Sequence, residues 1–324
     1  MKRTSRASAA TVREMNNRPT EAARETGATW QIVPDPRDFL SAARDALASD
    51  PVLGTVVATV ATRLAAELER GAPEPEHPHW FALATDPSGG LAGIAMRTAP
   101  FAPHPLYLLP MAASTAAALA DVLPDDGEPV TGANGAQPAT EAFVARVAER
   151  AGGRARVERP TRLFEVRGLV APPAPHGEAR IAGPADLDLV QAWYRRFHED
   201  ADRQAGRARP ADAPVLGSRD DVAERVSGGR TWLWTRDGTP VSMVGFAGPA
   251  LGVARVGPVY TPAEHRGRGY GGALTAHVSR LLLDRELRVC LFTDLENPVS
   301  NRLYERLGYR PVVDMAELRV EPAP

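Results

Sequence analysis

The feature that most constrains this chain is the stretch 256–272, which reads V-G-P-V-Y-T-P-A-E-H-R-G-R-G-Y-G-G. An apolar run of strand type ends near a proline, a basic turn with glycines at alternate positions follows, and residues 273–285 have helical periodicity. The first backbone amides of a helix have no intrahelical acceptor, and the helix dipole adds positive charge there. The stretch therefore predicts an anion site, most often one for phosphate.

The residue types of this turn suit a phosphate ligand. Gly267, Gly269 and Gly271 let a ligand approach the backbone without side chains in the way, while Arg266 and Arg268 supply cations. The two known nucleotide motifs do not fit, because no Gly-Lys-Ser/Thr follows and the spacing is R-x-x-G-x-G rather than G-x-G-x-x-G. Taken alone, the turn also fits a plain strand-to-helix connection that uses glycine for flexibility.

The composition excludes some classes of partner. The chain has 324 residues, a length typical of about two domains. It carries 38 basic and 40 acidic residues, and with a formal net charge of −2 it has no overall attraction to nucleic acid or to anionic membranes. Hydrophobic residues make up 44% of the chain and charged residues 24%, which is ordinary for a globular protein with a buried core.

Cysteine use and the N-terminal residues bear on the compartment. The single cysteine, Cys290, rules out an internal disulfide and lies in an apolar run, so a buried core thiol is predicted. No apolar run reaches the ~18 residues of a membrane span, and no apolar segment follows the N-terminal basic residues. We expect a cytoplasmic protein. Lys2 is the only lysine in a chain rich in Ala, Pro and Gly, which indicates a GC-rich, bacterial genome.

The chain divides into four segments. Residues 1–27 are polar and aperiodic and predict a disordered tail, with Met1 and Met15 both open as the true start. Residues 28–170 and 178–324 predict two domains, separated by the proline-rich linker 171–177.

The predicted elements repeat. In the first half, helices are predicted at 35–68, 112–123 and 139–151, and strands at 80–84, 91–98, 106–109, 130–133 and 162–169. In the second half, helices are predicted at 186–199, 218–226, 273–285 and 297–307, and strands at 180–181, 231–235, 240–246, 254–260, 289–293, 309–313 and 315–320. The shared order predicts two copies of one α/β fold.

A second motif narrows the anion. Residues 293–309 read T-D-L-E-N-P-V-S-N-R-L-Y-E-R-L-G-Y, about twenty-five residues after the glycine turn. Together the two motifs resemble the GNAT superfamily of N-acetyltransferases, whose pyrophosphate-binding R-x-x-G-x-G matches at Arg266, Gly269 and Gly271. The later helix of that family matches at Asn297, Asn301, Tyr304, Gly308 and Tyr309. The resemblance is strong over residues 254–313 and implies a mixed α/β sheet of the GNAT acyl-CoA N-acyltransferase fold, which we expect in tandem copies.

The resemblance implies acetyl-CoA, or another acyl-CoA, as the donor, with no metal. Its pyrophosphate would lie on the glycine turn, and its amide-rich pantetheine arm would pair with the strand edge before the turn, as an added strand does. Pro258, which lacks an N–H, helps to open the sheet there. The implied cofactor-binding residues are Val259, Tyr260, Thr261, Arg266, Gly267, Arg268, Gly269, Tyr270, Gly271, Gly272, Asn297 and Asn301.

Tyr304 matches the general acid of the family, which protonates the departing thiolate. Packing of Tyr304 in the core, a solvent-facing Asn301 and a helix-capping Asn297 are the alternatives to functional roles. Val299, Leu303 and Leu307 are predicted to lie on another face of the same helix and to pack inward.

The general base stays open. The strand before the glycine turn holds no acidic residue, where many relatives place a glutamate, and a route through bulk water is also possible. His265 points more naturally at solvent or phosphate. The remaining candidates are His198, Glu199, Asp200, Asp294 and Glu296.

The predicted function is N-acetylation of a primary amine by direct attack on the thioester. The acceptor is a small molecule or a peptide, and the protein is a monomer or a homodimer. The alternatives are a non-catalytic acyl-CoA sensor and a tandem-domain acyltransferase of thiol-metabolite synthesis, such as that of mycothiol. The N-terminal half lacks the basic glycine turn, reading L-Y-L-L-P-M-A-A-S instead, so it is predicted to be a degenerate copy without cofactor.

Overall fold

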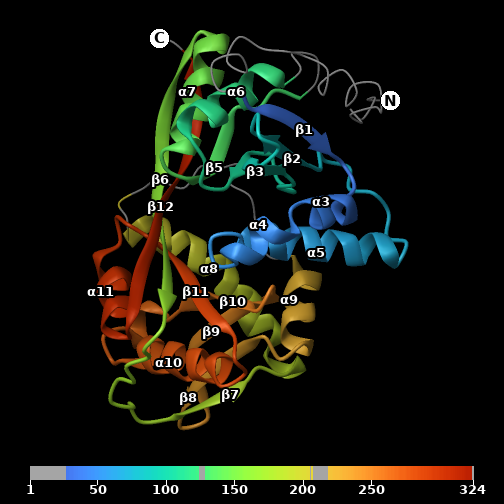
Figure 1. The fold of residues 1–324 in the computed structure, drawn as a ribbon. Coiled ribbons are helices and arrows are strands. Elements are labelled where there is room, and N and C mark those ends of the chain that lie inside the picture. The colour runs from blue at the N-terminus through green and yellow to red at the C-terminus, as the bar shows by residue number, and fades with distance from the viewer. Residues whose placement is uncertain (1–26, 124–127, 205, 207–217, 323–324) are drawn as a thin grey trace, which may run out of the picture. The chain divides into compact units, whose positions relative to one another are not determined.

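The computed structural model describes residues 27–123, 128–204, 206 and 218–322 (Figure 1). The predicted tail lies outside the described residues except for Gly27. The chain forms two compact units: unit 1 comprises residues up to 161 together with those from 313 onward, and unit 2 comprises residues 162–312. The proline-rich segment 171–177 lies within unit 2, between its first two strands.

Unit 1 follows the order β-α-α-β-β-β-α-β-α-β, in which the first α stands for two short consecutive helices, at 36–42 and 44–49. Its elements are β1 (Thr29–Val33), α3 (Pro36–Ala42), α4 (Arg44–Ser49), α5 (Thr55–Glu69), β2 (Trp80–Thr85), β3 (Leu91–Arg97), β4 (Leu106–Leu108), α6 (Ala113–Val122), β5 (Gly132–Ala136), α7 (Ala139–Ala151) and β6 (Gly153–Val166). Strands β1 to β5 neighbour one another in chain order, and the residues of β12 (Tyr309–Pro322) from 313 onward pair antiparallel with β5.

The sheet of unit 1 is covered on both faces. In β2, Trp80, Ala82 and Ala84 pack in the cluster that contains α6 and α7, whereas Phe81 and Leu83 pack in the cluster that contains α3 and α5. Side chains alternate across a strand, so a strand with helices on both faces is apolar throughout. This explains the continuous apolar run W-F-A-L-A in the sequence.

The helical pattern predicted over 35–68 is three helices in the structure, and β1 before it was not predicted. Asp35 caps α3 by accepting a hydrogen bond from the backbone N–H of Arg37. The segment D-P-V-L-G between α4 and α5 stops the helix, because Pro51 cannot donate a backbone hydrogen bond and the Asp50 carboxylate accepts one from the Leu53 N–H.

Strand β6 begins nine residues before the predicted strand at 162–169 and ends earlier, at Val166. Its first half is rich in charged residues, which are depleted in strands in general. In unit 1 these charges are paired with β12: Arg154 and Arg156 contact Glu321 at 2.9 and 2.7 Å, and Arg319 contacts Glu158 at 2.8 Å. Opposite charges on neighbouring strands stabilise their pairing. The charged first half of β6 can therefore form a strand because β12 supplies the opposite charges.

Unit 2 repeats the element order of unit 1. Its elements are β7 (Glu178–Ile181), α8 (Leu187–Gln204), α9 (Arg219–Ser227), β8 (Thr231–Arg236), β9 (Thr239–Ala250), β10 (Val253–Tyr260), α10 (Tyr270–Leu283), β11 (Arg288–Asp294), α11 (Pro298–Arg306) and β12. The two strands predicted at 309–313 and 315–320 are one continuous strand, β12.

The sheet of unit 2 runs β7-β8-β9-β10-β11, followed by the residues of β6 from 162 onward. Its two faces are also buried: Val244 and Phe246 pack with α10 and α11, whereas Met243 packs with α8 and α9. The same order, sheet topology and two-sided burial recur in both units, as predicted for a tandem. No helix in the described part of the chain is long and apolar enough to span a membrane.

Candidate active site in unit 2

Strands β10 and β11 separate after Val256, on the segment of chain that leads to the glycine turn. Their parallel pairing extends from Val253 with Arg288 to Val256 with Leu291, although β10 continues to Tyr260 and β11 to Asp294. On its other side β10 stays paired with β9, with an irregularity between Val256 and Val259. The end of β10 therefore has a backbone edge facing β11 that is not used in the sheet.

Two glycines shape the turn after β10. Gly267 has φ of 74° and Gly269 has φ of 82°, a left-handed conformation that side chains disfavour. Gly269 is the N-cap of α10, no side chain caps this end, and no acidic residue lies in the first turn. The first intrahelical bond runs from the Ala273 N–H to the Gly269 carbonyl, so the amides of the preceding residues have no helical acceptor.

The start of α10 lies beside both the end of β10 and helix α11. A Cβ built on Gly271 would be 3.1 Å from the Thr261 hydroxyl oxygen, and one built on Gly272 would be 3.0 Å from Leu303 Cδ1 of α11. The two motifs that carry the family resemblance therefore lie together in space. The side chain of Tyr270 is buried in the core between α10 and the sheet.

Arg266 and Arg268 have different surroundings. The Arg266 guanidinium donates from Nε to the Thr261 carbonyl at 2.9 Å and from Nη2 to Asp200 Oδ2 at 2.5 Å. Arg268 is exposed on the turn. The Tyr260 hydroxyl also donates to Asp200, at 3.0 Å, and burial together with this bond raises the pKa of Tyr260 to about 12.

Ser242 of β9 belongs to the same network and was not predicted. Its fully buried hydroxyl donates to the Tyr260 carbonyl at 3.0 Å and is 2.9 Å from the Thr261 hydroxyl. Val259, the first residue of the predicted strand edge 259–261, packs against the core. The sequence did hold a signal for Ser242, because it is the one polar residue in the apolar run V-S-M-V-G-F.

The two asparagines of α11 have distinct positions. Asn297 is the N-cap, and its side chain accepts from the N–H groups of Val299 and Ser300 at 3.2 Å. Asn301 donates through Nδ2 to the carbonyls of Asp294 and Asn297, each at 2.9 Å, which fixes the orientation of its amide. Asn301 Oδ1 is buried without a hydrogen-bond donor, and a buried acceptor of this kind suits a ligand N–H.

Tyr304 lies in the core cluster that also holds Val256 and Leu291, the last paired residues of β10 and β11. Its ring contacts that of Tyr309 edge-on, with centroids 5.9 Å apart. Burial raises the pKa of Tyr304 above its ordinary value of 10, so its hydroxyl keeps its proton at neutral pH. The position is compatible with core packing and with proton donation.

Val299 does not pack inward as predicted. Its side chain is 69% exposed, whereas Leu303 packs against the core and Leu307 is 1% exposed. Val299 is in the first turn of α11, beyond the edge of the core. Helical periodicity correctly put it on the same face as Leu303 and Leu307, but the core does not reach that far along the helix. Cys290 is fully buried, as predicted.

The candidate bases differ in environment. Glu199 and Glu296 are exposed. His198 packs edge-on against Phe197, with ring centroids 5.1 Å apart. The Asp294 carboxylate accepts a hydrogen bond from the Glu296 N–H at 2.9 Å. Burial raises the pKa of Asp200, but hydrogen bonds from Tyr260 and Arg266 outweigh it, and the net pKa lies below the ordinary 3.8. His265 Nδ1 is buried without a partner.

The corresponding strands of unit 1 are closed. There β4 pairs with β5 through its full length, ending at Leu108 with Gly135. A Cβ built on Gly135 would be 2.2 Å from the Leu108 carbonyl oxygen, so the two backbones are in direct contact. Helix α6 begins without a glycine turn. Among the described residues, no group of three or more His, Cys, Asp or Glu side chains is arranged to hold a metal ion.

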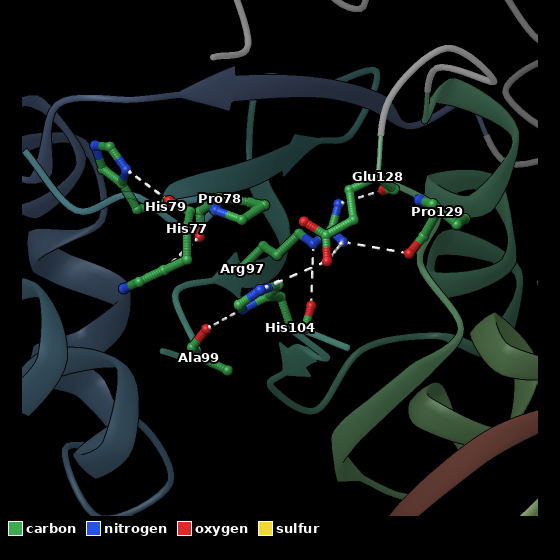
Figure 2. Close-up of polar contacts among 8 residues, drawn as sticks. All are labelled: His77, Pro78, His79, Arg97, Ala99, His104, Glu128 and Pro129. Atoms are coloured by element: carbon green, nitrogen blue, oxygen red, sulfur yellow. Dashed lines mark hydrogen bonds and ion pairs between the residues drawn. The ribbon is translucent and has the colours of Figure 1, made fainter. Parts of the chain in front are cut away.

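Unit 1 has instead a polar cluster around Arg97, at the end of β3 (Figure 2). Arg97 is 5% exposed and donates to three backbone carbonyls, those of His104, Glu128 and Pro129, at 3.0, 2.9 and 3.3 Å. The imidazole of His104 stacks on that of His77, with centroids 5.7 Å apart, and its Nε2 lies 3.5 Å from the Glu128 carboxylate. The guanidinium is occupied by carbonyls, which indicates a structural role in joining two loops.

Comparisons with known proteins agree with this geometry. Residues 188–309 match the model of the acetyltransferase (GNAT) family. No curated protein sequence matches the chain. The fold resembles a GCN5-related N-acetyltransferase from Sphaerobacter thermophilus, at 17% identity and a TM-score of 0.54, over 90% of this chain and 95% of that one.

A second similar structure is a GCN5-related glucosamine N-acetyltransferase region of a fungal multi-domain GH3 β-N-acetylglucosaminidase. It has 12% identity and a TM-score of 0.50, over 90% of this chain and 38% of that one. At these identities the likenesses establish the fold alone, and they extend across both units. Residues 188–309 therefore form a domain of the GNAT acetyltransferase family, within a chain whose two halves have the GNAT fold.

Proposed function

We propose that unit 2 transfers an acyl group from an acyl-CoA, acetyl-CoA in the first place, to the nitrogen of a primary amine. The observation that carries the proposal is the separation of β10 from β11 directly before a helix N-terminus with uncapped amides. A coenzyme A molecule carries both groups that such a site accepts: a pyrophosphate for the helix N-terminus and an amide-rich arm for the free strand edge.

The residues present fit this ligand. The amides of Tyr270, Gly271 and Gly272 would hold the pyrophosphate, with Arg268 as the exposed cation beside them. The backbone of residues 259–261 would pair with the pantetheine amides. Asn301 Oδ1, the buried acceptor without a donor, would take a further N–H from the arm.

In the proposed reaction the amine attacks the thioester carbonyl, so that a C–N bond forms and the C–S bond breaks. Tyr304 donates its proton to the departing sulfur, which leaves as the thiol of coenzyme A. The attacking amine loses its own proton to water or to a nearby base, and Tyr304 takes up a proton from solvent, so that the protein is restored. Backbone amides at the β10 irregularity would stabilise the charge on the carbonyl oxygen.

Unit 1 is not proposed to bind the donor, because its β4 and β5 stay in contact and its α6 lacks the glycine turn. We propose that it supports the fold or helps to select the acceptor.

The test has two stages. Calorimetric titration of the full chain with coenzyme A should give saturable binding with one molecule per chain, and absence of binding would refute the proposal. A panel of amines and short peptides is then incubated with acetyl-CoA, and release of the coenzyme A thiol is measured. Tight binding with no turnover across the panel would favour a sensor instead.

A further inference from the structure

Asp200 lies where helix α8 meets both the end of β10 and the glycine turn. Its side chain is 15% exposed. Oδ2 accepts two hydrogen bonds, from the Tyr260 hydroxyl of β10 at 3.0 Å and from Arg266 Nη2 of the turn at 2.5 Å. Oδ1 accepts from Arg203 on the solvent side. One carboxylate thus links three segments of unit 2.

The Arg266 guanidinium is held at two points. Nη2 binds Asp200, while Nε binds the carbonyl of Thr261, the residue directly after β10. A planar guanidinium can make both bonds at once with little loss of freedom, which a lysine ammonium at this position cannot reproduce. Because Asp200 neutralises its charge, Arg266 serves to shape the turn, and the exposed cation of the motif is Arg268.

The opposite side of the strand end is held by Ser242, which bonds the Tyr260 carbonyl and contacts the Thr261 hydroxyl. Residues 260 and 261 are thereby fixed from β9 on one side and from α8, through Asp200, on the other. These residues lie beyond Val256, the last residue of β10 that pairs with β11, so β11 does not pair with their backbone, although their carbonyls accept the bonds from Ser242 and Arg266. A free edge pairs well with a ligand only if its conformation is set in advance.

The hydrogen bonds that Asp200 accepts, and the lowered pKa that they cause, argue against its role as the general base. Although burial raises the pKa of its carboxyl, the bonds from Tyr260 and Arg266 lower it more, and Asp200 remains ionised at neutral pH. A base whose lone pairs are already bound by a guanidinium and a phenol is poorly placed to accept a proton from an amine.

We propose that Asp200 is a positioning residue that presets the end of β10 and the glycine turn for the acyl-CoA donor. The inference rests on the proposed function for the identity of the ligand. The positioning itself rests on the three bonds that Asp200 accepts.

The test compares Asp200→Asn with Asp188→Asn. Asp188 is on the same helix, is 85% exposed, and forms an ion pair with Arg219 at 2.7 Å. Asp200→Asn should weaken coenzyme A binding about tenfold by calorimetry and speed amide hydrogen exchange in peptides covering residues 260–270. With an active amine, the KM for acetyl-CoA should rise while kcat is retained. Asp188→Asn should change none of these.

The sign of the effect is decisive. Removal of a negative charge near a polyanionic ligand would by itself tighten binding, so unchanged or tighter binding with unchanged exchange would overturn the proposal. Arg266→Lys should behave like Asp200→Asn, and the double variant should be no weaker than the stronger single one, because both remove the same link.

Two further measurements separate the possible failures. If Asp200→Asn lowers the melting temperature so far that binding cannot be measured, Tyr260→Phe keeps the charge, removes one bond, and should weaken binding about threefold; no loss would count against the proposal. If the wild-type chain does not bind coenzyme A, the proposed function fails, and the exchange rates of residues 260–270 alone judge the positioning role.

Discussion

At the scale of single residues, two neighbouring buried tyrosines differ in the contacts of their hydroxyl groups. Tyr309 is fully buried and its hydroxyl is 2.6 Å from that of Ser279. Tyr304 packs edge-on against it, and burial alone accounts for the rise in its pKa. The raised pKa means that Tyr304 holds its proton at neutral pH and is a weaker acid than free tyrosine, so proton donation from it depends on the strong basicity of a departing thiolate beside it.

Tyr304→Phe should lower turnover about 100-fold with an active amine, because a general acid contributes roughly this factor or more. Coenzyme A affinity should stay within about twofold of wild type, since the ring and its packing remain. Initial rates and calorimetry measure the two effects.

The matched control is Tyr309→Phe, which removes a buried hydroxyl from the adjacent ring and its contact with Ser279. It should lower the melting temperature and leave turnover largely intact. If Tyr304→Phe turns over as fast as wild type, Tyr304 is a packing residue and the proton comes from elsewhere.

His77 makes the stability of unit 1 depend on pH. Burial is the largest cause that lowers the pKa of His77, and the neighbouring His104, His79 and Arg63 lower it further, against the bond with the Pro78 carbonyl (Figure 2). The folded chain therefore disfavours protonation of His77, whereas the unfolded chain binds the proton near the ordinary value of 6.5.

His77 thus contributes stability that is full above pH 6.5 and is lost as the pH falls through its lowered native value. His77→Gln should make the decline in melting temperature between pH 7.5 and 5.5 shallower than in wild type. His176→Gln, which removes a 74% exposed histidine, is the control. Equal slopes for wild type and His77→Gln in scanning fluorimetry would show that His77 does not control this decline.

At the scale of elements, the glycine turn depends on conformation more than on space. A Cβ on Gly267 or Gly269 would meet nothing within 4 Å, so the left-handed φ values, and not crowding within the chain, favour glycine there. The hairpin glycine Gly238 has a similar φ of 77° and an equally open surrounding, which makes it a natural comparison.

Gly269→Asp should weaken coenzyme A binding by about 100-fold or more, because it places a carboxylate beside the pyrophosphate. Gly238→Asp imposes a similar backbone strain at the β8–β9 hairpin and should leave affinity unchanged. Both are measured by calorimetry. Retained affinity in Gly269→Asp would remove the pyrophosphate from this turn.

Elements with local signals were predictable, and those that depend on distant partners were not. The order β10, turn, α10, β11 and α11 follows from periodicity and glycine spacing within about fifty residues. The first half of β6 could not be predicted in this way. Its residues Arg154, Arg156 and Glu158 pair with charged residues of β12 that lie more than 150 residues away in the sequence. The predicted start of α10 at 273 missed its first turn, since its two glycines disfavour a helix on propensity.

The site shows the same division. Tyr304, Asn297, Asn301 and the glycines were identified by motif, and their assigned roles stay predictions. Asp200 and Ser242 lie 60 and 18 residues from Tyr260 along the chain, and no spacing rule connects them. The sequence offered Asp200 as a candidate base and Ser242 as a polar residue in an apolar run, but their contacts with Tyr260 could be found only once the fold brought α8 and β9 to the end of β10.

At the scale of the whole molecule, one element order is used twice with opposite results. In unit 2 the strands that correspond to β4 and β5 separate before the helix, and in unit 1 they remain in contact. Unit 1 keeps the two-sided core of the fold and adds the Arg97 cluster. A repeated fold thus retains its packing while only one copy keeps the gap suited to a donor.

The chain crosses between its units twice, within β6 and within β12, since residues 162–166 belong to unit 2 and residues from 313 onward belong to unit 1. A single cleavage or gene break in the proline-rich segment 171–177 would leave each fragment with part of a strand that belongs to the other and without part of its own. Neither half of the sequence is therefore a self-contained module, because each unit includes a strand segment that the other half supplies.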